Sequence, residues 1–231
     1  DSIREKHKIL DYKGVFNYSA INNFAVKNCD GDYLVLLNND TEVVAEDWLY
    51  EMLQLAQEDG VGAVGARLLF PNETIQHAGV YIHENGVGGH IYHGFWKNSH
   101  GYMDRILIIN NVSAVTGACL VIKRSIFEEV GGLDETNLAV AFNDVDLCLK
   151  VMDKGYRNLY TPFAVLYHYE SMTRGPEDSL EKVARFNKER DFVLNKWHKY
   201  LIYDHYYNPN LVLNNGVLSL NFDVKKLRTL I

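Results

Sequence analysis

Two short apolar runs constrain the fold of this chain more than any other feature of its sequence. They are YLVLL, residues 33–37, and VGAVGARLL, residues 61–69. Runs of this length with little polar alternation are typical of strands buried on both faces of a sheet. Helical patterns are predicted before and between them, at Phe16 to Lys27 and at Asp47 to Gln57. The alternation of helix and strand predicts an α/β domain with a mostly parallel sheet flanked by helices.

The second half of the sequence continues this alternation after an interruption. Residues 72–111 are rich in Gly, His and Tyr and are predicted to form a hairpin or an irregular insert. Apolar runs at 114–122 and within 156–168 predict two further strands, with a helix at 143–154 between them. A long charged helix is expected from 178 to 200, followed by an irregular tail with weak strands.

Composition narrows the classes of partner and compartment. The 231 residues are 47% hydrophobic and carry a net charge of −7. A duplex-binding surface needs clustered Lys and Arg, so no nucleic-acid partner is expected. The three widely spaced cysteines predict reduced thiols in a cytoplasmic protein. No run approaches the roughly 20 apolar residues of a membrane span, which leaves peripheral association with the inner face of a membrane open.

A carboxylate follows the first apolar run directly. Asp40 lies in the segment NNDTE after YLVLL, and open α/β sheets bind ligands outside the carboxyl ends of their strands. A carboxylate there can hold Mg²⁺ or Mn²⁺, which in turn can bridge a diphosphate. The alternative for Asp40 is an Asx turn or a cap for the helix predicted after it.

Two further polar groups stand at element ends. Asp144 and Asp146 open the helix predicted at 143–154, where the helix dipole favours negative charge and where capping is the alternative explanation. His168 ends the last predicted strand, which makes it a candidate metal ligand or, alternatively, a surface histidine with other partners.

Four ordered motifs resemble the family 2 glycosyltransferases of the GT-A fold, a Rossmann-like α/β fold. They are LLNNDTEV, TGACLVIKRSIFEEVGGLDE, FNDVDLCLKVMDKGYRNLY and YHYESMTRG. The resemblance runs from about Phe16 to Gly175 and more weakly through Asp204 to Leu211. It is greatest to bacterial enzymes that build surface polysaccharides such as O-antigen or rhamnose-containing chains.

The resemblance implies a metal site and a catalytic base. NND is similar to the family's Asp-x-Asp motif, in which Asn38 stands at the first Asp and Asp40 at the metal-binding second Asp. His168 matches a histidine that completes the metal site in many relatives. Asp144 matches the second residue of the acidic pair that supplies the general base, and Asn143 replaces the first.

The resemblance also implies contacts to the sugar-nucleotide donor. Thr116 and Gly117 match the strand end beneath the donor sugar, where a glycine lets a ligand approach the backbone. Arg174 is expected to contact the diphosphate, and Asn23 matches an Asn of the helix beside the nucleotide pocket. The insert at 76–103 is expected to shape the acceptor side.

The domain organisation follows from the same comparison. Residues 1–176 are expected to form the GT-A catalytic portion without its first βαβ unit, because no strands match the family's base-binding strands. Residues 177–231 are expected to form a C-terminal helix and tail, which leaves self-association as a homodimer open.

The implied reaction is a metal-dependent, inverting transfer of a hexosyl or rhamnosyl group. A nucleoside-diphosphate sugar would be the donor, and a saccharide or lipid-linked saccharide hydroxyl would be the acceptor. Two alternatives remain: a glycosidase or phosphatase that uses the same carboxylates, and a catalytically incomplete carbohydrate-binding or assembly module of a larger glycosyltransferase.

Overall fold

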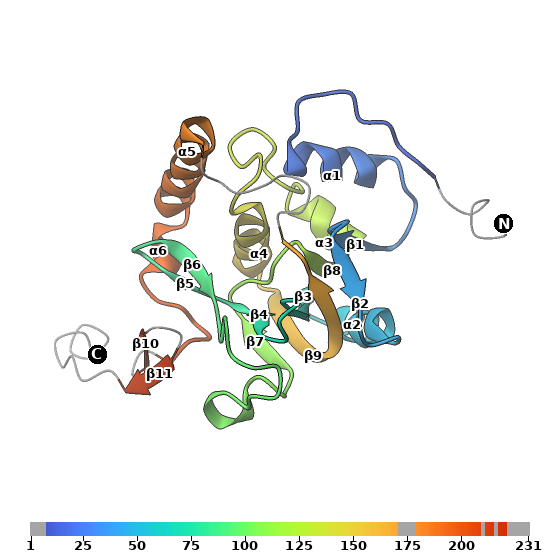
Figure 1. Ribbon diagram of the computed structural model, residues 1–231. Helices are drawn as coiled ribbons and strands as arrows, with labels where there is room; N and C mark the ends of the chain where they lie inside the picture. The colour runs from blue at the N-terminus through green and yellow to red at the C-terminus, as the bar shows by residue number, and fades with distance from the viewer. Residues whose placement is uncertain (1–7, 171–178, 209–210, 215–216, 221–231) are drawn as a thin grey trace.

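The computed structural model describes residues 8–170, 179–208, 211–214 and 217–220. Within these ranges the chain folds around one mixed β-sheet with helices on both faces (Figure 1). The strands of this sheet are β1 (Tyr33–Leu37), β2 (Thr41–Val43), β3 (Val61–Leu69), β4 (Ile75–His77), β7 (Asn110–Val112), β8 (Cys119–Lys123) and β9 (Arg157–His168). Two antiparallel hairpins stand outside it, namely β5 (Val80–His83) with β6 (Val87–His90), and β10 (Leu211–Asn214) with β11 (Val217–Leu220).

The helices alternate with the strands along the chain. They are α1 (Tyr18–Lys27), α2 (Trp48–Ala56), the 3₁₀ turn η2 (Tyr102–Asp104), α3 (Arg124–Glu129), α4 (Asn143–Asp153), α5 (Leu180–Lys196) and α6 (His198–Leu201). The N-termini of α1 and α5 are capped, because Asn17 and Ser179 accept hydrogen bonds from Ala20 N and Lys182 N. In the described residues no helix is both long and apolar enough to cross a membrane.

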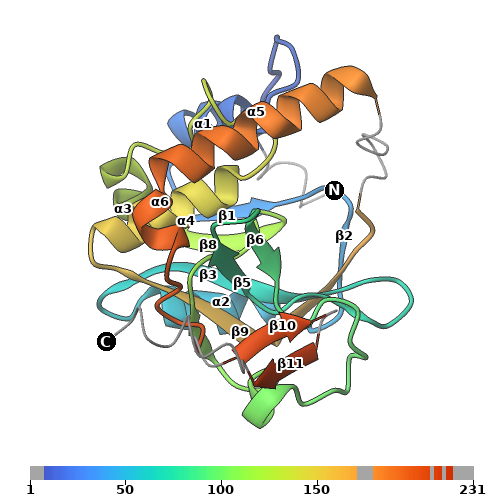
Figure 2. The ribbon, with the colours of Figure 1, turned by 90° about the vertical axis from the view of Figure 1, so that its left-hand side faces the viewer.

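Two apolar cores lie on opposite faces of the sheet. Figure 2 shows α1, α3, α4 and α5 together above the strands, and Figure 1 shows α2 on the side of the strands away from α4 and α5. Val26, Phe127 and Leu149 belong to the larger core, whereas Met52 and Ala56 of α2 belong to the smaller one. An α/β sheet covered on both faces is therefore confirmed. The last helices share the larger core, to which they contribute Val193, Trp197 and Leu201.

The prediction of a mostly parallel sheet is wrong. The strand order is β1-β8-β3-β9-β2, with β4 paired to β3 and β7 paired to β9. Among the described strands only β3 and β9 run parallel to each other. The reason is that an apolar run reports burial on both faces, and burial does not depend on the direction of the neighbouring strand.

Two of the predicted strands also differ from expectation. Val35 and Leu37, on one face of β1, are 37% and 44% exposed, whereas Leu34 and Leu36 on the opposite face belong to the larger core. β1 forms one edge of the described sheet. The strand predicted at 114–122 begins at Cys119. The backbone N–H groups of Thr116 and Gly117 donate to the side chains of His77 and Asp144, so these two residues do not extend the backbone hydrogen bonding of β8.

A buried carboxylate ties the C-terminal helices to α4. Asp146 is fully buried, and its Oδ1 accepts hydrogen bonds from Lys196 Nζ at 2.6 Å and Trp197 Nε1 at 2.7 Å. Lys150 Nζ lies 3.3 Å from the other oxygen. This network explains why a carboxylate is buried at position 146 without giving it a catalytic role, because its oxygens face α5 and its own helix.

We predict that Asp146→Ala lowers the free energy of unfolding by about 3 kcal/mol, because it leaves a buried indole N–H and partly buried ammonium groups without their acceptor. The control is Asp153→Ala on the same helix, where an exposed carboxylate meets Lys199 and Tyr200. That change should cost less than about 1 kcal/mol. Urea denaturation measures both values, and equal losses would contradict the role given to Asp146.

Candidate active site

Three chain segments meet at one edge of the sheet. Leu37, the last residue of β1, pairs with Cys119, the first residue of β8. One residue further on, Asn38 N donates to the Ala118 carbonyl at 2.9 Å. β2 then pairs antiparallel with the end of β9, where its first residue lies opposite His168. The turn that carries Asp40 is therefore held between the start of β8 and the end of β9, where ligands bind in open α/β sheets.

Asp40 and Asn38 of this turn lie beside His168 at the end of β9, so three of the predicted site residues are close together. His168 Nε2 lies 3.2 Å from Asp40 Oδ1 and 3.2 Å from Asn38 Nδ2, while His168 Nδ1 lies 2.7 Å from Gln76 Oε1. The side chains of Asp40 and His168 are only 13% and 10% exposed. Asp40 Oδ1 has no hydrogen-bond donor in the described part of the chain. A buried carboxylate oxygen without a donor, next to an imidazole nitrogen, suits a cation.

These two ligands do not form a complete metal site. No group of three or more His, Cys, Asp or Glu side chains able to hold a metal occurs among residues 8–170, 179–208 and the short strands after them. A divalent cation at Asp40 and His168 would need ligands besides these two side chains. Mg²⁺ in particular retains waters and substrate phosphate oxygens at sites with few protein ligands.

Asp144 makes one contact within its own helix and one with the segment before β8. Its Oδ2 accepts from Gly117 N at 3.0 Å, and its Oδ1 accepts from Val145 N at 2.8 Å. The N-cap of α4 is Phe142, in the left-handed region with φ +58°, so Asp144 is not the N-cap residue, although its Oδ1 meets an N–H group of the first turn. Tyr18 Oη donates to the Gly117 carbonyl at 2.8 Å. Burial raises the pKa of Tyr18, and the charge of Asp144 adds to the shift, so Tyr18 remains a neutral donor.

A side chain at position 117 would crowd this approach. A Cβ atom at this position would lie 3.0 Å from Tyr18 Oη and 3.5 Å from Asp144 Cβ. The absence of a side chain thus lets the backbone of the segment pass between the helix that carries Tyr18 and the helix that carries Asp144.

His77 contacts the segment that contains Thr116 and Gly117, and His90 packs against His77. His77 Nδ1 bonds to the Ala66 carbonyl at 2.9 Å, so it carries the proton, and His77 Nε2 accepts from Thr116 N at 3.3 Å. Burial lowers the pKa of His77 to about 3, which keeps the ring neutral. The His90 ring packs edge-on against it at 5.2 Å. Burial also lowers the pKa of His90, against the opposing charge of Asp144.

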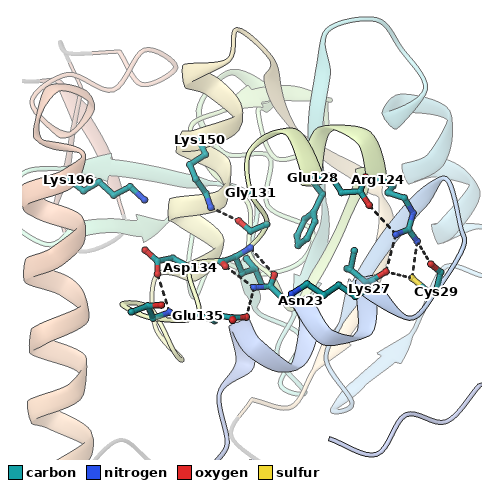
Figure 3. Close-up of a pocket in the computed structure, with 15 residues that line it drawn as sticks. Asn23, Lys27, Cys29, Arg124, Glu128, Gly131, Asp134, Glu135, Lys150 and Lys196 are labelled. Carbon is teal, nitrogen blue, oxygen red and sulfur yellow. Dashed lines mark hydrogen bonds and ion pairs between the residues drawn. The ribbon is translucent and has the colours of Figure 1, made fainter.

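One predicted donor-binding residue, Asn23, lies away from this site. The Asn23 amide bonds to Leu133 N, the Leu133 carbonyl and Glu135 Oε2, so its groups hold the loop after α3. Asn23 lines a pocket of about 640 Å³ that Asp40, Asp144 and His168 do not line (Figure 3). Arg174 lies outside the described residues.

The C-terminal helix reaches the segment before Asp144, which the sequence did not predict. Glu189 of α5 is buried, and its Oε2 accepts from Ala141 N at 2.6 Å. Phe186, one turn earlier, packs against Phe142 with ring centroids 5.0 Å apart. Residues beyond 176 therefore hold the backbone that leads into α4. The one sequence signal was the length of this helix, which does not show what it contacts.

Comparison with known proteins identifies the class. The family model described as "Glycosyl transferase family 2" matches residues 9–131, just over half of the chain. Together with the fold and the site, this match shows that the chain belongs to glycosyl transferase family 2, as the motifs suggested.

Two longer proteins contain a segment similar to this chain. It is 54% identical over 207 residues to the uncharacterized protein y4gI of Sinorhizobium fredii, covering 88% of this chain and 23% of that protein. It is 39% identical over 216 residues to the O-antigen biosynthesis protein RfbC of Myxococcus xanthus, covering 88% of this chain and 16% of that protein. The chain thus spans less than a quarter of either relative.

A solved structure supports the GT-A fold. The crystal structure of GalNAc-T7 with UDP, GalNAc and Mn²⁺ superposes with a TM-score of 0.60 at 11% identity. The match covers 84% of this chain and 38% of that one. At this identity the likeness concerns the path of the chain and not its chemistry.

The neutral state of His77 predicts a pH dependence of stability. Below about pH 6.5 the unfolded chain binds a proton at this residue that the folded chain excludes until about pH 3. The free energy of unfolding should therefore fall with decreasing pH in this window, by up to about 1.4 kcal/mol per pH unit from His77. In the His77→Gln variant the free energy of unfolding, measured by urea denaturation, should fall less steeply between pH 7 and pH 4.

The control for this prediction is His100→Gln, which removes an exposed imidazole of the insert. Its free energy of unfolding should change with pH as steeply as that of the wild type. If the His77→Gln variant also showed the wild-type dependence on pH, His77 would not be held neutral in the folded state.

Proposed function

We propose that this protein is a glycosyltransferase that moves a sugar from a nucleoside-diphosphate donor to a hydroxyl group of a saccharide or lipid-linked saccharide during surface-polysaccharide synthesis. Membership of glycosyl transferase family 2 supports the transferase activity. Similarity to a segment of an O-antigen biosynthesis protein supports the type of product.

One observation carries the proposal: a continuous series of contacts links the two predicted carboxylates. Asp144 Oδ2 accepts from Gly117 N, and the carbonyl of the next residue accepts from Asn38 N. The Asn38 side chain contacts His168, whose Nε2 faces Asp40 Oδ1. A metal-binding pair and a base on one rigid edge are what transfer between a diphosphate donor and a hydroxyl acceptor requires.

Asp40 Oδ1 and His168 Nε2 are the atoms that would hold Mg²⁺ or Mn²⁺. When bound, the cation would offset the negative charge that develops on the departing nucleoside diphosphate. The incomplete ligand set leaves coordination positions for diphosphate oxygens. GalNAc-T7, the solved structure with a similar fold, contains Mn²⁺ and UDP.

Asp144 is the general base of the proposed reaction. The N–H groups of Gly117 and Val145 orient its two oxygens, and each oxygen retains a lone pair. The carboxylate would take the proton of the acceptor hydroxyl as this attacks the anomeric carbon. With one base and direct attack, the configuration at that carbon is inverted, and no second carboxylate acts as a nucleophile.

The remaining assignments are part of the same proposal. Thr116, Gly117 and Asn38 lie at the site and would line the donor side. Asn23 and Arg174 stay predictions as donor contacts. The division into a catalytic portion, 1–176, and a C-terminal helix and tail, 177–231, is retained, with the helix supporting the catalytic portion through Glu189. A cytoplasmic location, membrane association and a homodimer also stay predictions.

Asp144→Asn is predicted to reduce transfer by at least about 100-fold, because the amide cannot accept the proton. The fold should persist, since the amide oxygen can still accept from Gly117 N. Product formation from UDP-, GDP- and dTDP-sugars with a saccharide acceptor is the measurement, and Asp153→Asn is the control. Near-normal turnover by the Asp144→Asn variant would refute the base. A wild type that neither binds these nucleotides with Mn²⁺ nor transfers sugar would favour the catalytically incomplete carbohydrate-binding or assembly module.

Activity is predicted to require a divalent cation and Asp40. EDTA should abolish transfer and Mn²⁺ should restore it. Asp40→Asn should weaken Mn²⁺ binding, followed by electron paramagnetic resonance in the presence of UDP. The matched control is Asp47→Asn, an exposed carboxylate before α2 that makes no cap hydrogen bond. Transfer that survives both EDTA and Asp40→Asn would rule out the metal role.

A further inference from the structure

A buried glutamine contacts the back of the proposed metal ligand. Gln76 lies in the short strand β4 and is only 5% exposed. Its Oε1 is 2.7 Å from His168 Nδ1, and its Nε2 donates to Glu170 Oε2 at 3.1 Å. The three side chains form a relay that ends on the histidine.

The chemistry of this relay allows only one arrangement of protons. A carboxylate accepts hydrogen bonds and does not donate them, so Glu170 fixes which end of the Gln76 amide is the NH₂ group. The amide oxygen then faces His168 Nδ1, and because that oxygen can only accept, Nδ1 must carry a proton. In the neutral ring the lone pair is consequently on Nε2, the atom that faces Asp40.

The surroundings of His168 Nε2 agree with this arrangement. Asn38 Nδ2, which can only donate, lies 3.2 Å from Nε2. Asp40 Oδ1 lies equally close and finds no hydrogen-bond donor within the described residues. With Nδ1 protonated, Nε2 and Asp40 Oδ1 both carry lone pairs 3.2 Å apart, and a cation bound by both atoms would offset their repulsion.

We infer that Gln76 is a positioning residue, which selects the Nδ1–H tautomer of His168. The lone pair of Nε2, which meets the Asn38 amide in this structure, then binds a divalent cation together with Asp40 when that contact is released. The inference rests on the metal site proposed above. Hydrogen bonds of this kind to the second nitrogen of a ligating histidine typically change metal affinity by about 10- to 100-fold when they are removed.

The relay is tested first by the tautomer of His168 without metal. ¹⁵N–¹H correlation spectra of the 231-residue chain should show a protonated Nδ1 and an unprotonated Nε2, assigned through the signals lost in His168→Ala. In Gln76→Leu the Nε2–H form of His168 should appear. A wild-type His168 protonated at Nε2, or an unchanged tautomer in Gln76→Leu, would overturn the inference.

The second test is Mn²⁺ affinity, by electron paramagnetic resonance. Gln76→Leu should weaken binding about 10- to 100-fold. The double variant Gln76→Glu/Glu170→Gln should restore it, because the carboxylate introduced at position 76 can accept from both His168 Nδ1–H and the new amide. The matched control is Gln54→Leu, which removes an exposed glutamine that also donates to a glutamate, Glu51. This control should bind Mn²⁺ like the wild type.

These results separate the inference from the proposed function. If the wild type binds no Mn²⁺, the metal site fails, and the tautomer spectra still show whether Gln76 orients the ring. If Mn²⁺ binds and the double variant stays as weak as Gln76→Leu, the site stands and the role of Gln76 is overturned. Near-ultraviolet circular dichroism identifies the variants that remain folded. If Gln76→Leu does not fold, the double variant Gln76→Glu/Glu170→Gln still gives a decisive result.

Discussion

The geometry of the site depends on the central strand β3. All nine of its residues are buried, and it pairs antiparallel with β8 and parallel with β9. Its glycines make this close packing feasible, because a Cβ at Gly65 would lie 2.5 Å from Val115. These opposite pairings bring the start of β8 and the end of β9 to the same edge. Gly117 precedes the first of these ends, and His168 completes the second.

Burial at this edge has electrostatic consequences. Asp40 and His168 are removed from most water, so an unpaired carboxylate oxygen there is costly unless a proton or a cation meets it. The surrounding groups are fixed in neutral or hydrogen-bonded states by their partners, as His77 is by Ala66 and Thr116. A polar site of this kind is preorganised, because its donors and acceptors hold their orientation before any substrate binds.

The sequence predicted the parts of the site that depend on local pattern. Asp40 and His168 are 128 positions apart, yet both follow apolar strands, and strand ends of an α/β sheet meet at one edge. Strand direction was not predictable, because an apolar run is the same in either direction. Gln76, Tyr18 and Glu189 were missed, since each acts through a long-range contact that no periodicity encodes.

The central claim is that Asp40, His168 and Asp144 form one site at this edge, apart from the pocket beside Asn23. Anomalous diffraction from crystals grown with MnCl₂ and UDP tests it most directly. The predicted result is a Mn²⁺ peak bonded to Asp40 and His168, with the nucleotide diphosphate completing its ligands near Gly117. A Mn²⁺ peak at Asp134 and Glu135, which line the pocket beside Asn23, with Asp40 and His168 uncoordinated, would contradict the account.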